Sequence, residues 1–219
     1  PQVKAMKSDN RDNSLKYWNN LFTSWDKENI KYDDWLDRFS KIIEKCSIPI
    51  LDLGCGYGNN TLYLIEKGKQ VIACDQSLNA IKNLQKNLPE VYQALCFNML
   101  DGLPFKDNSF KIVIADLCLH YFTEQETIMI INEIKRVLMT NGHLMFRVNS
   151  INDTNHGAGQ SPEIAHHLYE TKDKRLKRFF DKDDIEYFFH DFDVEYLEEE
   201  TMQSRYDLPK KLFRGCLKR

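Results

Sequence analysis

The sequence predicts an α/β protein built on a doubly wound, mostly parallel β-sheet with helices on both faces. Short apolar runs alternate with amphipathic helical patterns between residues 48 and 149, which is typical of parallel sheets covered by helices. The strand-like runs are continuously apolar, as expected of strands buried on both faces. A polar residue ends each run, at the edge where such sheets bind ligands: Asp52, Asp75, Asn98, Asp116 and Asn149.

The elements of this alternation can be placed along the chain. Helices are expected at residues 60–67, 77–87 and 123–139. Thr123 and Glu126 form a capping box that opens the third helix, and Gly142 is expected to end it. The second helix has its apolar residues on one face: Leu78, Ile81, Leu84 and Leu88. Strands are expected at residues 48–52, 70–74, 94–98, 111–116 and 143–149.

The N-terminal part precedes this core. Residues 1–46 are expected to form a helical segment that packs on a domain formed by residues 47–219. Residues 1–14 are polar and are expected to be frayed. Residues 15–46 predict one or two helices and hold all three tryptophans, Trp18, Trp25 and Trp35.

The C-terminal part includes a segment that could cover a substrate. Residues 150–180 are expected to form a lid, because Gly157 and Gly159 can act as its hinges. The pair Ser161-Pro162 predicts the start of a short helix. A second capping box, from Asp181 to Asp184, predicts the helix that follows. Its apolar residues are expected to be core: Ile185, Phe188 and Phe189.

The composition limits the class of protein. The chain has 219 residues, of which 42% are hydrophobic and 29% charged, with a net charge of −3. These values are typical of one globular domain, and the near balance of charge argues against a dedicated nucleic-acid binder. No apolar run is long enough to cross a membrane and no signal peptide is recognisable. We therefore expect a cytoplasmic protein without a nucleic-acid or membrane partner.

The cysteines and histidines predict neither disulfides nor a metal. No two of the six cysteines are close enough for a CxxC pair. Cys74, Cys96 and Cys118 lie in apolar runs and are expected to be buried, as in a reducing compartment. No partner at metal-ligand spacing is found for three of the histidines: His156, His166 and His167.

A glycine-rich loop carries the strongest functional signal. The chain runs from an expected strand into Gly54-Cys55-Gly56-Tyr57-Gly58 and then into a helix. Such glycines let a ligand approach the backbone, and Asp75, at the end of the next strand, can accept hydrogen bonds from ribose hydroxyls. A dinucleotide site would carry glycine at position 59, where this chain has Asn59. Asp52 before the loop can bind an ammonium group, so the pattern favours a nucleoside joined to an amino acid over a loop that only makes a tight turn.

These motifs resemble those of a known enzyme family. ILDLGCGYGNNT resembles motif I of the class I S-adenosylmethionine-dependent methyltransferases, and VIACDQS resembles their second motif. LPFKDNSFKIVIADLCLHYF is similar to their third and fourth motifs, and EIKRVLMTNGHLMFRV to the segment after the active site. The resemblance implies a Rossmann-like, seven-stranded sheet with an antiparallel last strand. Residues 150–219 more loosely resemble a tellurite-resistance-like, small-molecule subgroup.

The resemblance also implies a role for each matching position. Asp75 would bind the ribose of the cofactor, with Gln76 and Ser77 beside the adenosine. Asn98 would contact the adenine amino group, and Asp116 with Leu117 would border the sulfonium. The methionine part would lie against Asp52, Gly54, Cys55, Gly56 and Asn59, and the adenine ring against Met99 and Leu100.

The sequence departs from the family pattern at two places. Where relatives often have Pro-Gly-Gly, this chain has Thr140-Asn141-Gly142, which changes only a turn. Where they often carry Asp after Ser-Phe, it has Lys111, expected at the surface. Neither departure falls on an implied cofactor contact.

The candidates for catalysis follow the fourth strand. His120 could be a general base, because its unperturbed pKa lies near neutrality, or it could only line the pocket. Tyr121 could line the substrate site or merely pack. Substrate contacts are further expected from Trp18, Arg147 and His156. Tyr17 and Tyr32 could close over the cofactor.

We interpret the sequence as a methyltransferase acting on a small molecule, as a monomer or homodimer. Three alternatives stay open. Residues 172–178 are rich in Lys and Arg, which could instead attract RNA or a protein substrate, although a solvated loop is the simpler interpretation. The chain could also bind the cofactor without catalysis, or it could be a dinucleotide oxidoreductase, which the loop spacing disfavours.

Overall fold

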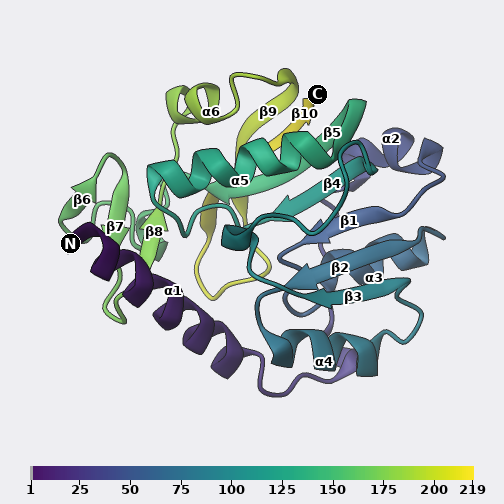
Figure 1. Cartoon of the computed structure of the whole chain (residues 1–219), viewed down its shortest axis with the longest axis horizontal. Helices are drawn as coiled ribbons and strands as arrows, with labels where there is room; N and C mark the ends of the chain where they lie inside the picture. The colour runs from purple at the N-terminus through teal and green to yellow at the C-terminus, as the bar shows by residue number, and fades with distance from the viewer. Residues whose placement is uncertain (1) are drawn as a thin grey trace.

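The computed structural model describes the backbone of residues 2–219 and the side chains from Asn10 onward. A seven-stranded sheet runs through its centre in the order β3-β2-β1-β4-β5-β10-β9 (Figure 1). β10 is antiparallel to both of its neighbours, and the pairings from β3 to β5 are parallel. The predicted fold class is confirmed. The strands are β1 (Ile50–Leu53), β2 (Val71–Asp75), β3 (Gln93–Cys96), β4 (Phe110–Asp116), β5 (Leu138–Asn149), β9 (Asp193–Met202) and β10 (Lys210–Lys218).

Helices cover both faces of this sheet because alternate strand residues point to opposite sides. In β4, Val113 packs in the core on the side of α5 and α6, whereas Ile112 packs with the N-terminal segment, α3 and α4. The apolar runs therefore fill two separate cores, as their continuous hydrophobicity predicts. The helices are α1 (Gln2–Leu21), α2 (Ser40–Lys45), α3 (Asn59–Glu66), α4 (Leu78–Asn87), α5 (Glu124–Val137) and α6 (Lys182–Phe188).

Both predicted capping boxes are confirmed. The Thr123 hydroxyl accepts a hydrogen bond from the backbone N–H of Glu126, and the Thr123 backbone N–H donates to the Glu126 carboxylate. Asp181 and Asp184 make the same reciprocal pair at the start of α6. The helix that follows buries Ile185, as expected.

Three element predictions were wrong in detail. α1 begins at Gln2, so residues 2–14 are helical, while Pro1 lies outside the described residues. α5 ends at Val137 and β5 begins directly after it; Gly142 lies inside β5, where its backbone passes so close to the Met139 carbonyl that a Cβ would come within 2.8 Å of that oxygen. Leu78 is 47% exposed, because the first residue of α4 lies off its buried face.

The segment expected as a lid has a different local structure. Instead of the helix predicted after Ser161-Pro162, the chain forms a three-stranded antiparallel sheet, in the order β6-β7-β8. Leu168 and Leu176 are buried on it, a pattern too short to be recognised as strands beforehand. Its strands are β6 (Glu163–Ala165), β7 (Leu168–Glu170) and β8 (Leu176–Arg178).

The small sheet and α1 lie beside each other over the same edge of the large sheet (Figure 1). The Leu176 N–H in β8 donates to Asn10 Oδ1 of α1 at 2.9 Å. At the other end of α1, Asn19 accepts a hydrogen bond from the Ser77 hydroxyl at 2.6 Å. α1 therefore bridges the small sheet and the start of α4.

The cysteine and membrane expectations can be compared with this fold. All six cysteines are free; Cys74 is buried and Cys118 half-buried, but Cys96 is exposed because β3 is the edge strand. Among residues 2–219, no helix combines the length and the apolarity that crossing a bilayer requires.

Candidate active site

A cavity of about 820 Å³ opens at the carboxyl ends of the central strands. α1 and β8 contribute to its wall, so it is partly covered. It brings together most of the residues that the sequence singled out: Trp18, Gly54, Cys55, Gly56, Asn59, Asp75, Gln76, Asn98, Met99, Leu100, Asp116, Leu117, His120, Tyr121, Arg147 and His156.

The glycine loop is held against this cavity by Asp75. Its Oδ2 accepts the Gly56 N–H at 3.0 Å and its Oδ1 accepts the Ser77 N–H at 2.9 Å. Each carboxylate oxygen can accept a further hydrogen bond, so the carboxylate retains acceptor capacity for a ligand. Burial raises the pKa of Asp75 above its usual value, against the lowering effect of these N–H groups.

Gly54 needs its lack of a side chain. Its φ is +70°, in the left-handed region, and a Cβ there would lie 2.7 Å from the Cβ of Cys118. Cys118 is fixed in turn, because its thiol donates to the Leu53 carbonyl at 3.2 Å. The loop is therefore shaped by contact with the segment after β4 as well as by its own sequence.

Two of the residues singled out by the resemblance, Asp52 and Ser77, do not line the cavity. Asp52 is buried beneath the loop, and its Oδ2 accepts the Thr61 hydroxyl at 2.6 Å. Burial raises its pKa to about 7. Ser77 caps α4 by accepting the Ala80 N–H at 3.1 Å. Both side chains support the cavity wall without forming its surface in this structure.

The adenine end implied by the resemblance has an amide whose orientation is fixed by hydrogen bonds. Asn98 Oδ1 accepts the Leu100 N–H at 2.9 Å, and Asn98 Nδ2 donates to Gln76 Oε1 at 3.0 Å. Phe97 and Met99 also line this end. A carboxylate acceptor, an amide and apolar walls in this order fit the ribose and the purine of an adenosine.

A buried ion-pair network lies between the two ends of the cavity. Arg147 binds Asp116 through Nε and Nη2, at 2.7 and 2.9 Å, and donates through Nη1 to Asp33 at 2.6 Å. Burial favours the neutral acid, but the Arg147 charge outweighs it and lowers the pKa of Asp116 to about 2. Asp116 also accepts from Asn60 Nδ2 at 3.0 Å and from Arg205 Nη1 at 3.4 Å. Asp116 is therefore ionised, and both of its carboxylate oxygens accept hydrogen bonds.

The sequence did not indicate all of this network. Arg147 was expected to contact the substrate; it lines the cavity, but its guanidinium is paired with Asp116. Asp33 was missed, because it lies 114 residues from Arg147 in the chain and no local pattern marks it. Asn60 was not singled out, although it lies within the segment ILDLGCGYGNNT that the sequence marked.

His120 lies at the other end of the cavity with a defined hydrogen-bond partner. The Asn149 N–H donates to His120 Nδ1 at 3.4 Å. Burial lowers the pKa of His120 well below its usual value, so the ring is neutral. A neutral ring that accepts at Nδ1 carries its proton on Nε2. This arrangement makes His120 a hydrogen-bond donor at Nε2.

Aromatic rings enclose the space around His120. Trp18 of α1 meets Tyr121 edge to face at 5.3 Å between ring centroids, and Tyr121 meets His120 at 4.4 Å. The guanidinium of Arg175 lies 3.5 Å over the Tyr17 ring, which joins α1 to the end of the small sheet. Trp18 therefore belongs to the cavity wall. His156 lines it too, close to Tyr206 at 5.1 Å.

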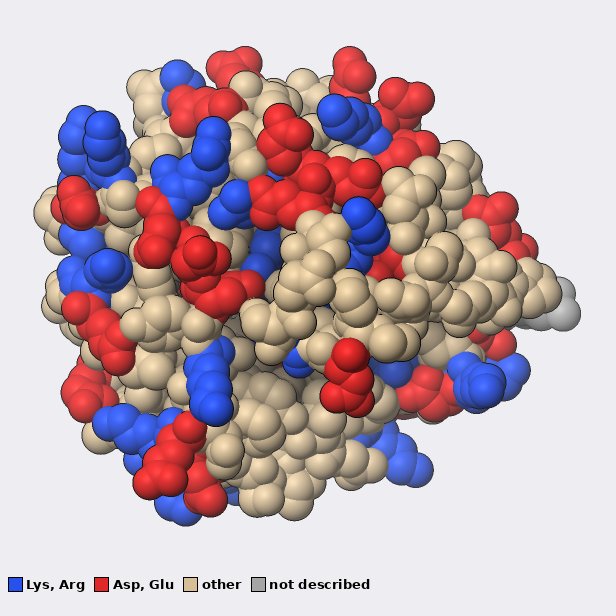
Figure 2. All heavy atoms as spheres, turned by 180° about the vertical axis from the view of Figure 1, so that it is seen from behind, with Lys and Arg blue, Asp and Glu red and all other residues tan. Residues whose placement is uncertain are grey.

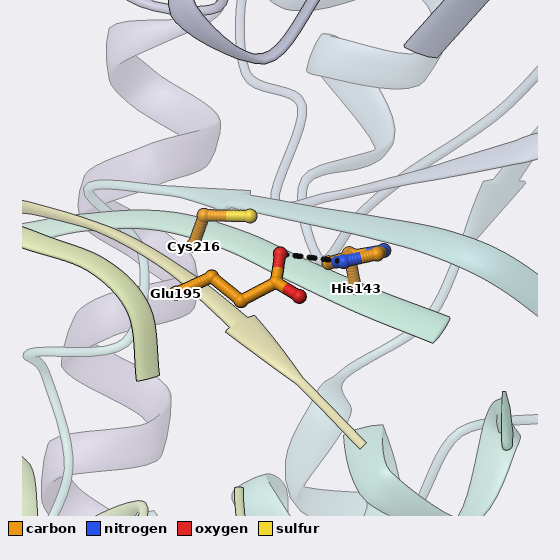
Figure 3. Close-up of side chains that lie close together, drawn as sticks. All are labelled: His143, Glu195 and Cys216. Carbon is orange, nitrogen blue, oxygen red and sulfur yellow. Dashed lines mark hydrogen bonds and ion pairs between the residues drawn. The ribbon is translucent and has the colours of Figure 1, made fainter. Parts of the chain in front are cut away.

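Two clusters away from this cavity hold side chains that bind metals in other proteins. In Figure 3, Glu195 lies between His143 and Cys216, from β9, β5 and β10, with His143 Nε2 and Glu195 2.8 Å apart. His166 and His167 both contact Asp184, a partner that sequence spacing missed because it lies 18 and 17 residues further on. None of these residues lines the cavity.

The family comparison agrees with this geometry. Residues 51–146 match the family model described as a methyltransferase domain. The glycine loop, the strand order and this match define a class I S-adenosylmethionine-dependent methyltransferase domain. The match covers 96 of the 219 residues, and over this segment the chain is similar to that family. The narrower likeness to a tellurite-resistance-like subgroup stays a prediction.

Individual relatives are similar over different lengths. An uncharacterized methyltransferase of Synechocystis sp. is 32% identical over 93 residues, which are 42% of this chain and 43% of that protein. The tRNA N(3)-methylcytidine methyltransferase of Schizosaccharomyces pombe is 25% identical over 195 residues, covering 78% of this chain and 76% of that one. The chain spans less than half of the first three curated relatives, at 43%, 45% and 42% of their lengths.

A solved structure shares the fold over the whole chain. It is 1,6-didemethyltoxoflavin-N1-methyltransferase of Burkholderia thailandensis, with bound 1,6-didemethyltoxoflavin and S-adenosylhomocysteine. The TM-score is 0.67 at 16% sequence identity, covering 100% of this chain and 89% of that one. At this identity the likeness shows the fold alone.

Proposed function

We propose that the protein transfers the methyl group of S-adenosylmethionine to a small molecule. The observation that carries this proposal is the continuity of the cavity, which runs from the Asp75 end, past the Asp116–Arg147 pair, to His120 and Tyr121. A cofactor bound at the first end would have space for an acceptor beyond it. Bound S-adenosylmethionine supplies an electrophilic methyl group.

The residues of the chain would hold the two reactants in line. Asp75, Asn98 and the glycine loop would orient the nucleoside, while Tyr121 and Trp18 would enclose the acceptor. Alignment of this kind can lower a barrier by roughly 7–11 kcal/mol. His120 Nε2 would donate a hydrogen bond to the acceptor and fix its orientation. The mechanism then needs no base at neutral pH for an acceptor that is already deprotonated.

A nucleic-acid or protein substrate is the second candidate, because one relative acts on tRNA. The basic segment 172–178 gives it little support. Arg175 stacks on Tyr17, Lys174 pairs with Glu170 at 2.8 Å, and Arg178 is buried. On the face shown in Figure 2, acidic and basic side chains are interspersed. A phosphate-binding surface usually has a basic excess on one face.

The same cavity argues against the alternative of a protein that binds the cofactor without catalysis. A module that only binds the cofactor would be favoured if side chains filled the space beyond Asp116, but that space is open.

We propose that α1 and residues 150–180 together cover the open end of the cavity. Arg11 of α1, which lines the cavity, pairs with Asp101 on the surface, at 2.8 Å for one of its two bonds.

Binding experiments separate these functions. Calorimetry should show binding of S-adenosylmethionine and S-adenosylhomocysteine but not of NAD. Release of S-adenosylhomocysteine should then be measured with a library of small aromatic and heteroaromatic acceptors, and with unmodified tRNA. NAD binding in place of the two sulfur compounds would refute the cofactor assignment. Turnover with tRNA alone would refute the small-molecule acceptor.

A further inference from the structure

Lys177 differs from Lys210 and Arg175 at the acceptor end of the cavity, because it has no ion pair with a carboxylate among the described side chains. It lines the cavity from β8, and its Nζ donates to the His156 carbonyl at 2.7 Å. Among the side chains that the structure describes, no Asp or Glu forms an ion pair with it. A mostly buried ammonium group normally has a carboxylate partner.

The two nearest cations do have such partners. Lys210 Nζ contacts Asp153 Oδ2 at 2.7 Å, and both side chains are buried. Arg175 Nε contacts Asp173 Oδ2 at 2.8 Å. Burial lowers the pKa of Lys177 to about 8; the charges of Lys210 and Arg175 also lower it, whereas the Asp153 carboxylate, already paired with Lys210, raises it. One positive charge at this end is therefore left without a counter-ion.

The walls beside Lys177 are aromatic. His156, whose carbonyl Lys177 binds, packs against Tyr206, and His120 packs against Tyr121. All four rings line the cavity. Aromatic walls favour flat ligands, which they contact edge to face or offset.

We propose that the acceptor is a flat aromatic acid whose anionic group pairs with Lys177. This inference rests on the proposed function, since it names the substrate class of the same cavity. The Asp75 carboxylate lies at the cofactor end, whereas the charged neighbours of Lys177 are Lys210, Asp153 and Arg175. The acid therefore binds beyond the cofactor.

The test compares acids with neutral analogues of the same shape. Benzoate, 2-naphthoate and indole-3-acetate are each titrated against their primary amides by calorimetry, with S-adenosylhomocysteine at saturation. In the wild type, at least one acid should bind about tenfold or more tightly than its amide, the scale of a charge-assisted hydrogen bond. K177M should abolish this preference and K177R should retain most of it. K172M removes an exposed lysine on the same segment and should change nothing.

The outcomes distinguish this inference from the proposed function. If S-adenosylhomocysteine does not bind the wild type, the proposed function fails. If it binds but no acid is preferred over its amide, or if K177M keeps the preference, only the inference is overturned. A loss of S-adenosylhomocysteine affinity in K177M would also overturn it, because Lys177 would then bind the methionine carboxylate of the cofactor. Intact cofactor affinity in K177M also shows that the variant is folded.

Discussion

Replacing Asp75 tests the cofactor end of the cavity most directly. Its two oxygens each accept one backbone N–H, from Gly56 and Ser77, which leaves one acceptor site on each for a ribose hydroxyl. Hydrogen bonds to a charged group contribute about 1.5–3 kcal/mol each. Losing two in D75A should therefore cost about 3–6 kcal/mol, or roughly a hundredfold to ten-thousandfold in affinity.

Calorimetry with S-adenosylhomocysteine measures this loss. Because D75A also leaves two loop N–H groups without their acceptor, its folding should be verified by circular dichroism. D75N should lose less affinity, since its amide keeps one oxygen. D183A, an exposed change on α6, is the control for the loss of one negative charge. An affinity of folded D75A within about threefold of the wild type would refute the role of Asp75.

Three further predictions concern Asp52, Gly54 and His120. Burial raises the folded pKa of Asp52 to about 7 from 3.8, so the protonated carboxyl stabilises the fold fully below pH 3.8, and this stabilisation is lost as pH rises through 7. The free energy of unfolding in urea should therefore fall between about pH 5 and pH 8, and this fall should be about 2–3 kcal/mol smaller in D52N than in the wild type. G54A should unfold more easily than G159A, because both glycines have a φ of +70° but only the Cβ at Gly54 would meet a neighbour. Nitrogen NMR should find His120 neutral with its proton on Nε2 throughout about pH 6–8, since burial lowers its pKa.

Each of these has a clear contrary result. Equal pH dependence of stability in D52N and the wild type would show that the Asp52 carboxyl is not the titrating group. Equal free energies of unfolding in G54A and G159A would mean that the contact with Cys118 relaxes without cost. A His120 titration near its unperturbed pKa of about 6.5, or a proton on Nδ1, would restore the general-base hypothesis.

The sheet was predictable because its information is local. Each parallel strand is a short, continuously apolar run that ends in a polar residue, and parallel order places those ends at one edge. Asp75, Asn98 and Asp116 therefore reach the same cavity. The capping boxes were equally local, since Thr123 and Glu126 are three residues apart.

The acceptor end was not predictable to the same degree, because its contacts join distant segments. Arg147 meets Asp33 across 114 residues, and the tautomer of His120 depends on the N–H of Asn149 in another strand. The sequence marked residues 172–178 as a basic run but gave no sign that Lys177 would line the cavity without an ion pair to a described carboxylate. Whether a basic side chain of this segment is neutralised depends on the fold and cannot be derived from the basic sequence alone.

The charge pattern along the cavity also limits how catalysis can work. Asp116 lies between the two ends, and Arg147 holds its pKa at about 2, so it stays ionised and its oxygens stay occupied by Arg147 and Asn60. It can orient a reactant through its fixed charge but is a poor proton acceptor. Because Asp116 is held in its ion pair with Arg147 and His120 carries its proton on Nε2, the described cavity offers no strong base beside the acceptor. An acid anchored by Lys177 that presents an ionised oxygen, or a nitrogen with a free lone pair, would need none.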